Sequence, residues 1–327
     1  MQLAAPVRRH GSVGTLAQMD SYGFQFQAMS STCEIRLDGD DEAVLAAAAQ
    51  RAIGEVQRLE STYSRYRADS IVSRINAAAG SGEGIEVDAE TSALLDFAGQ
   101  LHALSNGLFD ITSGVRRRVW DFKAGKLPQP NHLRELLPLL GWHRVERREQ
   151  QVYLPQAGME LDFGGFGKEY AADRAMAVLA EAGQRHGFVN LGGDIRVLGP
   201  RANGSAWRFG IQHPRRENAT IASVEMVEGA LASSGDYERF FEIDGQRYCH
   251  ILDPRTGRPV RAWSSVSVTA PACIAAGALS TIAMLKGEHA LDFLATQRAS
   301  YFAVDAALQT FHYEQPNSRP FDHGVKP

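Results

Sequence analysis

The strongest constraint on the fold is the way in which short apolar strands gather in one part of the chain. Between residues 187 and 270, segments rich in β-branched and aromatic residues follow one another, separated only by Gly, Pro, Asn or Asp. These segments are 187–199, 206–212, 220–227, 238–243, 247–252 and 264–270. Because the strands cluster instead of alternating strictly with helices, the pattern favours an α+β fold over a doubly wound one.

Apolar residues at helical spacing predict helices on both sides of this strand-rich region. Segment 41–64 has the clearest pattern, with Asp40 or Asp41 as its N-cap and an apolar stripe of Val44, Leu45, Ala48, Ala52, Val56 and Leu59. Further helices are expected at about 89–105, 131–140, 168–183, 271–286 and 288–297. Strands are expected at 24–37, as a pair near 144–154 and as two at the end of the chain, and an exposed loop with two prolines at 123–132.

Composition limits the classes of protein to which the chain can belong. A length of 327 residues allows two average domains or one α+β domain. Without an internal repeat or a low-complexity linker, we expect one domain over 23–315, an N-terminal extension over 1–22 and a tail over 316–327. The net charge of −4 argues against a nucleic-acid partner, and we interpret the arginine run 116–118 as solvated surface.

Cysteines and hydropathy point to a reduced, non-membrane environment. Three widely spaced cysteines, Cys33, Cys249 and Cys273, predict neither a disulfide framework nor a zinc cluster, and each is expected to fill a small apolar gap. No stretch of 18 apolar residues and no continuous apolar leader region occurs. We therefore expect a cytoplasmic protein without membrane insertion.

Two glycine-rich stretches are candidates for ligand binding. In 161–174 an apolar strand end passes through a glycine-rich turn into a helix, where backbone N–H groups and Lys168 can bind phosphate. Asp162 and Glu169 rule out a P-loop, and the dinucleotide fingerprint G-x-G-x-x-G is absent. In 190–199, Gly-Gly-Asp lies within a strand-rich region. From the residues alone, each stretch is either a ligand-binding site or a simple tight turn.

A third stretch, 231–259, combines a possible polar site with good turn chemistry. His250 lies three residues before the turn 253-DPRTG-257, and Ser233 to Asp236 form a polar group between two strands. A structural role for the histidine remains open. Near the N-terminal third, Tyr63 at the end of a helix is compatible with stacking on a nucleobase or flavin, and also with an ordinary helix end.

Taken in order, these stretches resemble the ApbE family, the FAD:protein FMN transferases. The resemblance spans about residues 28 to 290 and rests on eight blocks, namely 28-AMSST, 61-STYSRYRADSIVSRIN, 109-FDITSG, 162-DFGGFGKEYAAD, 190-NLGGDI, 233-SSGDY, 250-HILDPRTGRP and 276-AGALST. It implies a single α+β flavin-transferase domain that binds FAD and a divalent cation, usually Mg²⁺. Such enzymes cleave the FAD pyrophosphate, pass FMN to a threonine or serine hydroxyl of an acceptor flavoprotein, and release AMP.

The resemblance also implies roles for particular residues. His250 corresponds to a histidine of the family proposed to act in proton transfer, and Lys168 would act beside it. The FAD site would be lined by Met29, Tyr63, Asp110, Thr112, Gly164, Gly165, Lys168, Gly192, Gly193, Asp194, Ser234, Asp253 and Thr256.

The expected metal site departs from the family pattern. In the family, a helix donates an Asp and, four residues on, a Thr, and a loop carbonyl is the third protein ligand. This chain keeps Thr281, but Gly277 stands at the Asp position, and Gly167 stands at the carbonyl position. Mg²⁺ prefers carboxylate oxygen, so the loss should weaken metal binding. We hypothesise that Glu169, where the family usually has glycine, replaces the missing ligand; alternatively, it only favours the helix dipole.

Three functions therefore remain open. The first is FAD:protein FMN transferase. The alternatives are a non-catalytic FAD-binding protein with a degenerate metal site and an FAD pyrophosphatase in which water replaces the acceptor hydroxyl.

Overall fold

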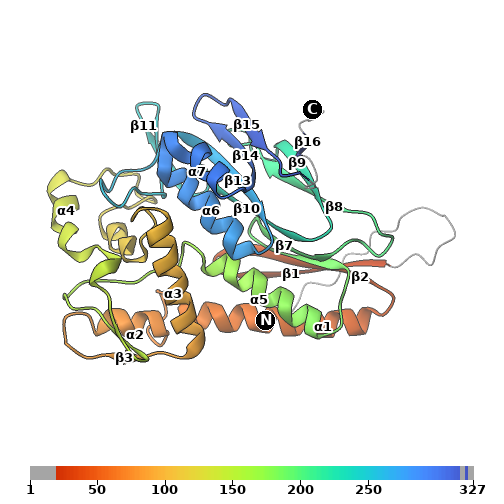
Figure 1. Ribbon diagram of the computed structural model, residues 1–327, viewed down its shortest axis with the longest axis horizontal. Helices are drawn as coiled ribbons and strands as arrows, with labels where there is room; N and C mark the ends of the chain where they lie inside the picture. The colour runs from red at the N-terminus through yellow and green to blue at the C-terminus, as the bar shows by residue number, and fades with distance from the viewer. Residues whose placement is uncertain (1–19, 317–320, 323–327) are drawn as a thin grey trace.

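An eight-stranded antiparallel sheet forms the centre of the computed structural model, which describes residues 20–316 and 321–322 (Figure 1). Its strand order is β1-β2-β6-β7-β10-β13-β14-β15. The strands are β1 Asp20–Ala28, β2 Ser31–Gly39, β6 Gly187–Leu191, β7 Asp194–Gly199, β10 Gly229–Gly235, β13 Trp263–Ala270, β14 Ser300–Asp305 and β15 Thr310–Tyr313. All described pairings are antiparallel. The predicted α+β class is confirmed.

Helices cover one face of this sheet and form a second layer (Figure 1). Helix α1 packs on α5 and against strands β1 and β2, and α6 packs on β10 and β13. The described α-helices are α1 Glu42–Tyr63, α2 Ile71–Ala77, α3 Ala89–Leu104, α4 Pro130–Glu135, α5 Gly167–Glu181, α6 Cys273–Lys286 and α7 Ala290–Thr296. Four 3-10 helices accompany them: η1 Ile111–Arg118, η2 Leu137–Leu139, η3 Trp142–Arg144 and η4 Gly287–His289.

Smaller sheets extend the structure at its margins. Strands β16 Phe321–Asp322, β9 Thr220–Met226 and β8 Trp207–Gln212 form one, and β3 Ile85–Glu86, β5 Gln151–Tyr153 and β4 Glu146–Arg148 form another. The hairpin of β11 Phe240–Ile243 and β12 Gln246–Cys249 projects from the end that carries α4 (Figure 1).

The prediction of one strand over 24–37 is wrong, because the chain turns back within it. Met29 and Ser30 have φ angles of 51° and 60°, and they form the two-residue turn between β1 and β2. Such turns match the twist of a hairpin, but Asn and Gly are their usual signals. The sequence 28-AMSST carries neither residue, so the turn gave no local signal.

Several other expectations can be compared with the structure. Asp41 caps α1 through bonds from the N–H groups of Ala43 and Val44, as predicted. Val44 itself is 53% exposed, so its place in the buried stripe was wrong. The expected helix 131–140 is broken, since α4 ends at Glu135 and the chain tightens into η2, which contains Pro138.

The expected domain limits differ slightly from the observed strands. Strand β1 begins at Asp20 and buries Tyr22, three residues before the expected domain start at 23. The short strand β16 lies within the expected tail and pairs with β9. The remainder of the expected extension, residues 1–19, lies outside the described residues.

The structure also bears on the expectations for the cysteines and for membrane-spanning helices. Cys33, Cys249 and Cys273 are free and buried, as predicted. Within the described part of the chain, no helix combines the length and the apolar character needed to cross a bilayer.

Candidate functional site

A glycine-rich turn carries the chain into α5 and presents Lys168 and Glu169. Phe163 and Phe166 are buried on either side of the turn and anchor it in the core. A Cβ on Gly165 would lie 2.8 Å from the ring of Phe109, so the turn needs glycine there. Asp162 accepts the N–H of Gly164 and is flanked by two arginines, Arg65 at 3.1 Å and Arg117 at 3.0 Å.

Lys168, whose side chain is 30% exposed, forms an ion pair with the buried Asp194 at the start of β7. Its Nζ lies 2.8 Å from Asp194 Oδ2 and donates to the carbonyl of Gly192 at 3.3 Å. Gly192 and Gly193 form the β6–β7 turn with φ of 61° and 98°. Burial opposes the charge on Lys168, but Asp194 and Glu169 outweigh this effect and raise the pKa of Lys168 to about 12. Two of the predicted glycine-rich stretches are thus joined by one lysine.

Glu169 occupies the space beside Gly277 on α6. A Cβ on Gly277 would lie 2.5 Å from both Cγ and Oε1 of Glu169, so no side chain fits at position 277 while Glu169 keeps this position. Glu169 is 8% exposed, and its Oε2 is buried without a hydrogen-bond partner. Burial, followed by the charge of Asp194, raises the pKa of Glu169 to about 8. The glycine and the new carboxylate therefore depend on each other sterically.

Hydroxyl groups from β10 and α6 continue the cluster next to Gly277. Ser234 Oγ lies 2.9 Å from Thr281 Oγ1 and 2.8 Å from Ser280 Oγ. Ser280 in turn donates to the carbonyl of Gly277 at 3.0 Å. Because Gly277 and Thr281 are one turn apart on α6, Thr281 lies on the same helix face as the position that Glu169 contacts.

His250 follows β12 and lies in a positively charged surrounding. Its Nδ1 is buried and has no hydrogen-bond partner. Burial first, and then the charges of Arg239 and Arg117, lower the pKa of His250 to about 4, with a smaller effect from Lys168. The imidazole is therefore neutral at pH 7, and one of its nitrogens remains available.

Arg116 holds the turn that follows His250, so the interpretation of residues 116–118 as surface is wrong for Arg116, whereas Arg117 and Arg118 are exposed. Its side chain is fully buried, and it donates to the carbonyl of Pro254. Its Nε and Nη1 have no partner. Gly257, with φ of 67°, leaves the space that the guanidinium fills, and Trp120 Nε1 donates to the carbonyl of Gly257 at 2.9 Å.

Among the polar residues of that turn, Asp253 is half-buried, and Arg255 and Thr256 are exposed. Asp253 accepts two bonds from the Arg255 side chain, at 3.1 and 2.8 Å. Burial opposes its ionisation, but these bonds hold the pKa of Asp253 below its ordinary value. Thr256 is exposed and accepts the N–H of Arg258 at 3.2 Å.

Thr112 and Asp110, which the resemblance places in the FAD lining, bond to each other and to the segment around η3. Thr112 is fully buried and accepts the N–H of Gly141 at 2.8 Å. Asp110 accepts the N–H and hydroxyl of Thr112 and the N–H of Trp142. These bonds tie η1 to η3.

Met29 and Tyr63 lie at the margin of the cluster. Met29 N–H donates to Glu60 Oε1 at 2.7 Å, and the neighbouring Ser31 lies against Gly192, where a Cβ would approach within 2.7 Å. Tyr63 packs its ring 5.4 Å from that of Phe163 and places its hydroxyl 3.2 Å from Thr91 Oγ1. Burial raises the pKa of Tyr63 above its ordinary value.

Sequence reasoning missed Asp173, which positions α6 relative to α5. Its two carboxylate oxygens accept the N–H groups of Cys273 and Ile274, each at 2.9 Å. Ala272 precedes the helix and offers no side-chain cap. The sequence did contain one signal. Helix α6 begins after Pro271 and Ala272, neither of which can cap it, so its first N–H groups need an acceptor from another segment.

A cavity of about 600 Å³ lies beside these residues but does not include the cluster. It is lined mainly by apolar side chains of α3, α5 and β7, such as Phe97, Met176 and Val197, and by the Asp173–Arg196 ion pair. None of the predicted site residues lines it. Among residues 20–316 and 321–322, no three His, Cys, Asp or Glu side chains are grouped so as to hold a metal ion.

Together, the fold and the cluster define an α+β protein with a Lys–carboxylate centre at a glycine-rich strand-to-helix turn. The family model described as the ApbE family matches residues 29–304. The chain belongs to the ApbE family.

Individual relatives agree with this assignment. A FAD:protein FMN transferase of Treponema pallidum is 33% identical over 85% of this chain and 82% of its own length. An ApbE protein of Thermotoga maritima has a solved structure with a TM-score of 0.83 at 29% identity, covering 90% of this chain and 97% of that one. The flavin transferase ApbE of Vibrio cholerae matches with a TM-score of 0.79 at 25% identity, covering 90% and 97%.

Proposed function

We propose that this chain is a FAD:protein FMN transferase that transfers FMN from FAD to a threonine or serine hydroxyl of an acceptor flavoprotein. The acceptor oxygen attacks the phosphorus on the FMN side of the pyrophosphate. The bond from that phosphorus to the bridging oxygen breaks, AMP leaves, and the hydroxyl proton passes to a base. Names of the relatives and the order of the eight sequence blocks support this reaction.

One observation carries the proposal, namely the neutral His250 with a free, buried Nδ1 among cations. A pyrophosphate needs positive groups, and its attacking hydroxyl needs a base. The charges that lower the pKa of His250 come from Arg239, Arg117 and Lys168. A bound pyrophosphate would offset these charges and raise the pKa of the imidazole toward the range that suits proton acceptance.

Lys168 is the proposed direct electrostatic contact with the phosphates. It extends from the first turn of α5, where backbone N–H groups also favour an anion. Asp194 holds the ammonium in place. The remaining predicted residues, Met29, Tyr63, Gly164, Gly165, Gly192, Gly193, Ser234, Asp253 and Thr256, are proposed to shape the flavin site around it.

The residues around Gly277 fit a divalent cation such as Mg²⁺. Glu169 offers a carboxylate with an unpartnered buried oxygen, Thr281 offers a hydroxyl, and Gly167 offers the expected carbonyl. These are the hard oxygen donors that Mg²⁺ prefers. The proposed ligands are therefore Glu169, Thr281 and Gly167, with the carboxylate donated by α5 in place of α6. When bound, Mg²⁺ would neutralise charge on the pyrophosphate.

Mass spectrometry tests the reaction. The chain is incubated with FAD, Mg²⁺ and an acceptor domain, and acceptor mass and AMP are measured. An acceptor heavier by one FMN supports the transferase. AMP with free FMN identifies a pyrophosphatase, and bound FAD with neither product identifies a binding protein. His250→Gln should lower transfer by about 100-fold or more while FAD binding persists.

Metal titration tests the role of Glu169 without relying on activity. Mn²⁺ binding, followed by electron paramagnetic resonance, should weaken by at least about tenfold in Glu169→Gln. Glu181→Gln, at the other end of α5, is the matched control. The double variant Glu169→Gly with Gly277→Asp returns the carboxylate to α6 and should recover the affinity. Unchanged Mn²⁺ binding in Glu169→Gln contradicts the proposed ligand.

A further inference from the structure

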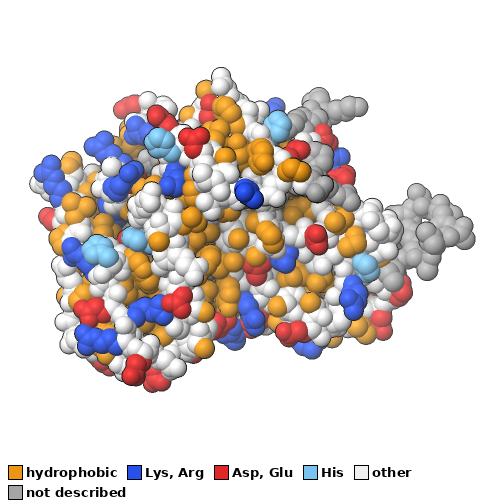
Figure 2. All heavy atoms as spheres, in the orientation of Figure 1, with side chains coloured by type: hydrophobic (Ala, Val, Ile, Leu, Met, Phe, Trp, Pro, Cys, Tyr) orange, Lys and Arg blue, Asp and Glu red, His pale blue; other side chains and the backbone are white. Residues whose placement is uncertain are grey.

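The cavity of about 600 Å³ between α3, α5 and β7 owes its space to short side chains. Four alanines line it, namely Ala93, Ala177, Ala180 and Ala272. A side chain that stops at Cβ leaves space in front of the backbone, whereas protein interiors are otherwise close-packed. Figure 2 shows hydrophobic side chains over the region between α3 and α5. The volume lies in the range that is typical of sites for small molecules.

Larger side chains give the cavity a continuous apolar wall. Phe97 of α3 meets the ring of Phe166 edge-on, with 5.6 Å between the ring centroids and an interplanar angle of 90°. The wall is completed by Met176, Leu198 and Ile274. Water makes few hydrogen bonds against such a wall, so an apolar group that displaces it gains affinity.

The carboxylates of the cavity are paired with arginines. Glu90 accepts two bonds from Arg58, each at 2.9 Å, and one from the Tyr170 hydroxyl at 2.8 Å. Asp173 lies 3.1 Å from Arg196 Nε and accepts the first N–H groups of α6. An anion in the cavity would lie beside these carboxylates and a cation beside Arg196, so the balanced charges favour an uncharged ligand.

One polar group of the wall has no partner. Arg196 lines the cavity, and its Nη1 donates to the carbonyl groups of Gly229 at 2.8 Å and Val197 at 3.3 Å. Within residues 20–316 and 321–322, its Nη2 donates no hydrogen bond, and the side chain is 24% exposed. The N–H groups of Nη2 can therefore bind an acceptor oxygen.

We propose that this cavity binds a small, uncharged and mainly apolar molecule whose carbonyl oxygen accepts a hydrogen bond from Arg196 Nη2. The apolar wall supplies the affinity, and the guanidinium orients the ligand. This inference does not rest on the proposed transferase function, because none of the predicted site residues lines the cavity. It assigns the chain a second ligand site.

A fluorescent naphthyl ketone, Prodan, tests the site directly. Prodan is uncharged, and its emission shifts to shorter wavelength in apolar surroundings, so titration should show saturable binding. Ala93→Phe and Ala180→Phe each add a ring to the lining from an exposed position on a helix. Each should raise the Kd for Prodan by at least about tenfold, because the ring takes the space of the ligand.

Arg196→Lys tests the hydrogen bond separately from the space. Lysine keeps a cation for Asp173 but lacks the guanidinium fork that carries a second donor. The Kd for Prodan should rise by about tenfold. The Kd for phenylnaphthylamine, an uncharged probe without a carbonyl group, should stay the same. Lys168→Ala, in the proposed reaction centre, should bind Prodan like the unaltered chain.

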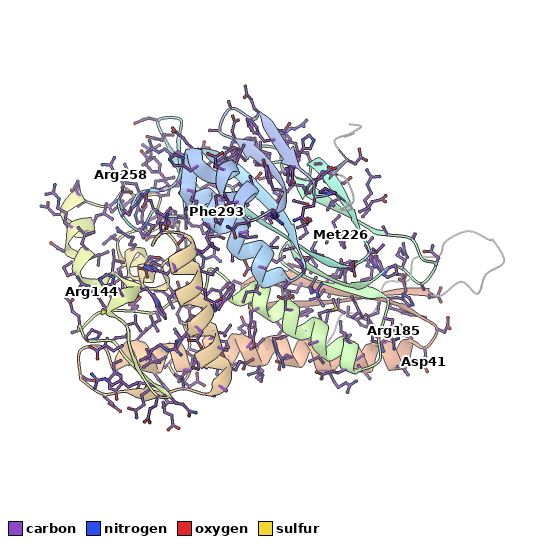
Figure 3. The ribbon with its side chains drawn as sticks, viewed as in Figure 1. Asp41, Arg144, Arg185, Met226, Arg258 and Phe293 are labelled. Carbon is purple, nitrogen blue, oxygen red and sulfur yellow. The ribbon has the colours of Figure 1, made fainter. Side chains whose placement is uncertain are left out.

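Ala47→Phe is the matched control, because Ala47 is an exposed alanine of α1 that does not line the cavity. It lies near Asp41, the N-cap of α1, which Figure 3 shows at the end of the molecule away from α3. This variant should bind Prodan like the unaltered chain.

Three results would overturn the proposal. One is the lack of saturable Prodan binding, or a Kd that neither Ala93→Phe nor Ala180→Phe changes. Another is equally tight binding of anilinonaphthalene sulfonate, which would identify an anion site. The third is an Arg196→Lys variant in which the Kd values of Prodan and phenylnaphthylamine change equally, since Nη2 would then not bind the carbonyl.

Discussion

Two glycines in this protein leave room for a buried charge, and the two charges are opposite. On α6, Gly277 makes space for Glu169, and in the turn after His250, Gly257 makes space for Arg116. Both charged groups have polar atoms without a partner, Oε2 in the first case and Nε and Nη1 in the second. The same steric device therefore places a carboxylate in one region and a guanidinium in the other.

The two regions differ in whether the buried charge can be neutralised by a proton or by a bound ion. Burial raises the pKa of Glu169 to about 8, so that side chain can take up a proton or meet a cation. Burial also lowers the pKa of Arg116, but a guanidinium stays charged under all ordinary conditions. The fold must keep that cation, and among the described residues its one hydrogen-bond acceptor is the carbonyl of Pro254, with Asp253 and Asp110 nearby. The acidic region is thus suited to exchange a ligand, and the basic region is suited to hold a shape.

The largest expected effect is on the basic region. Gly257→Ala adds a Cβ against the Arg116 guanidinium and strains a residue with φ of 67°. Strain and overpacking together should lower the free energy of unfolding by about 3 kcal/mol in urea denaturation. Gly204→Ala, with φ of 80° and open space around it, should lose only about 1 kcal/mol. Equal losses in the two variants would mean that Arg116 does not need this glycine.

A smaller effect reports how strongly burial and the neighbouring cations Arg239 and Arg117 act on His250. The pKa of His250 is about 4 in the folded chain and 6.5 when unperturbed, so only the unfolded chain takes up this proton as pH falls through 6.5 toward 4. The stability contributed by neutral His250 is therefore complete above pH 6.5 and is lost on acidification. Between pH 7.5 and pH 5 the loss should be on the order of 1–2 kcal/mol.

His250→Gln should lack this part of the acid destabilisation. Comparing its urea denaturation with that of the unaltered chain at both pH values isolates the effect of the one histidine. An identical loss in both chains would show that folding does not lower the pKa of His250.

The smallest expected effect is the change in stability caused by Gly277→Ala in the acidic region. Its sign should depend on whether residue 169 is Glu or Ala. Gly277→Ala gains helix propensity but places a Cβ 2.5 Å from Glu169, for a net loss of about 1 kcal/mol. In a Glu169→Ala background the same substitution should stabilise the chain, which a double-mutant cycle by urea denaturation measures. Gly54→Ala in α1, with open space around it, should stabilise in both backgrounds. A Gly277→Ala effect that is independent of residue 169 contradicts the steric pairing.

Sequence patterns predicted the parts of this molecule that depend on local periodicity. The α+β class and the helices α1, α3, α5 and α6 follow from apolar spacing and are present near their expected limits. The pairing of Glu169 with Gly277 was also accessible, because one departed from the family pattern where the other did. Each of these features can be read from a short segment of the sequence or from comparing a sequence block with the family pattern.

What was missed depends on contacts between distant segments. Arg116 stands in a run of three arginines that resembles solvated surface, and only the turn 253–257 explains its burial. Asp173 lies 100 residues from the helix start that it caps. The β1–β2 turn uses Met29 and Ser30 at positive φ, a conformation that tertiary packing imposes on residues with no preference for it.

The contact between Glu169 and Gly277 also restricts how such a site can change by mutation. In the family pattern the carboxylate belongs to the position of Gly277, and here it belongs to position 169. Single substitutions linking the two arrangements pass through a chain with both carboxylates, which overpacks α5 against α6, or through one with neither, which lacks the charged donor. Under the proposed role of Glu169 as a cation ligand, one intermediate loses stability and the other loses cation binding, so a barrier in sequence space separates the present pair from the usual one.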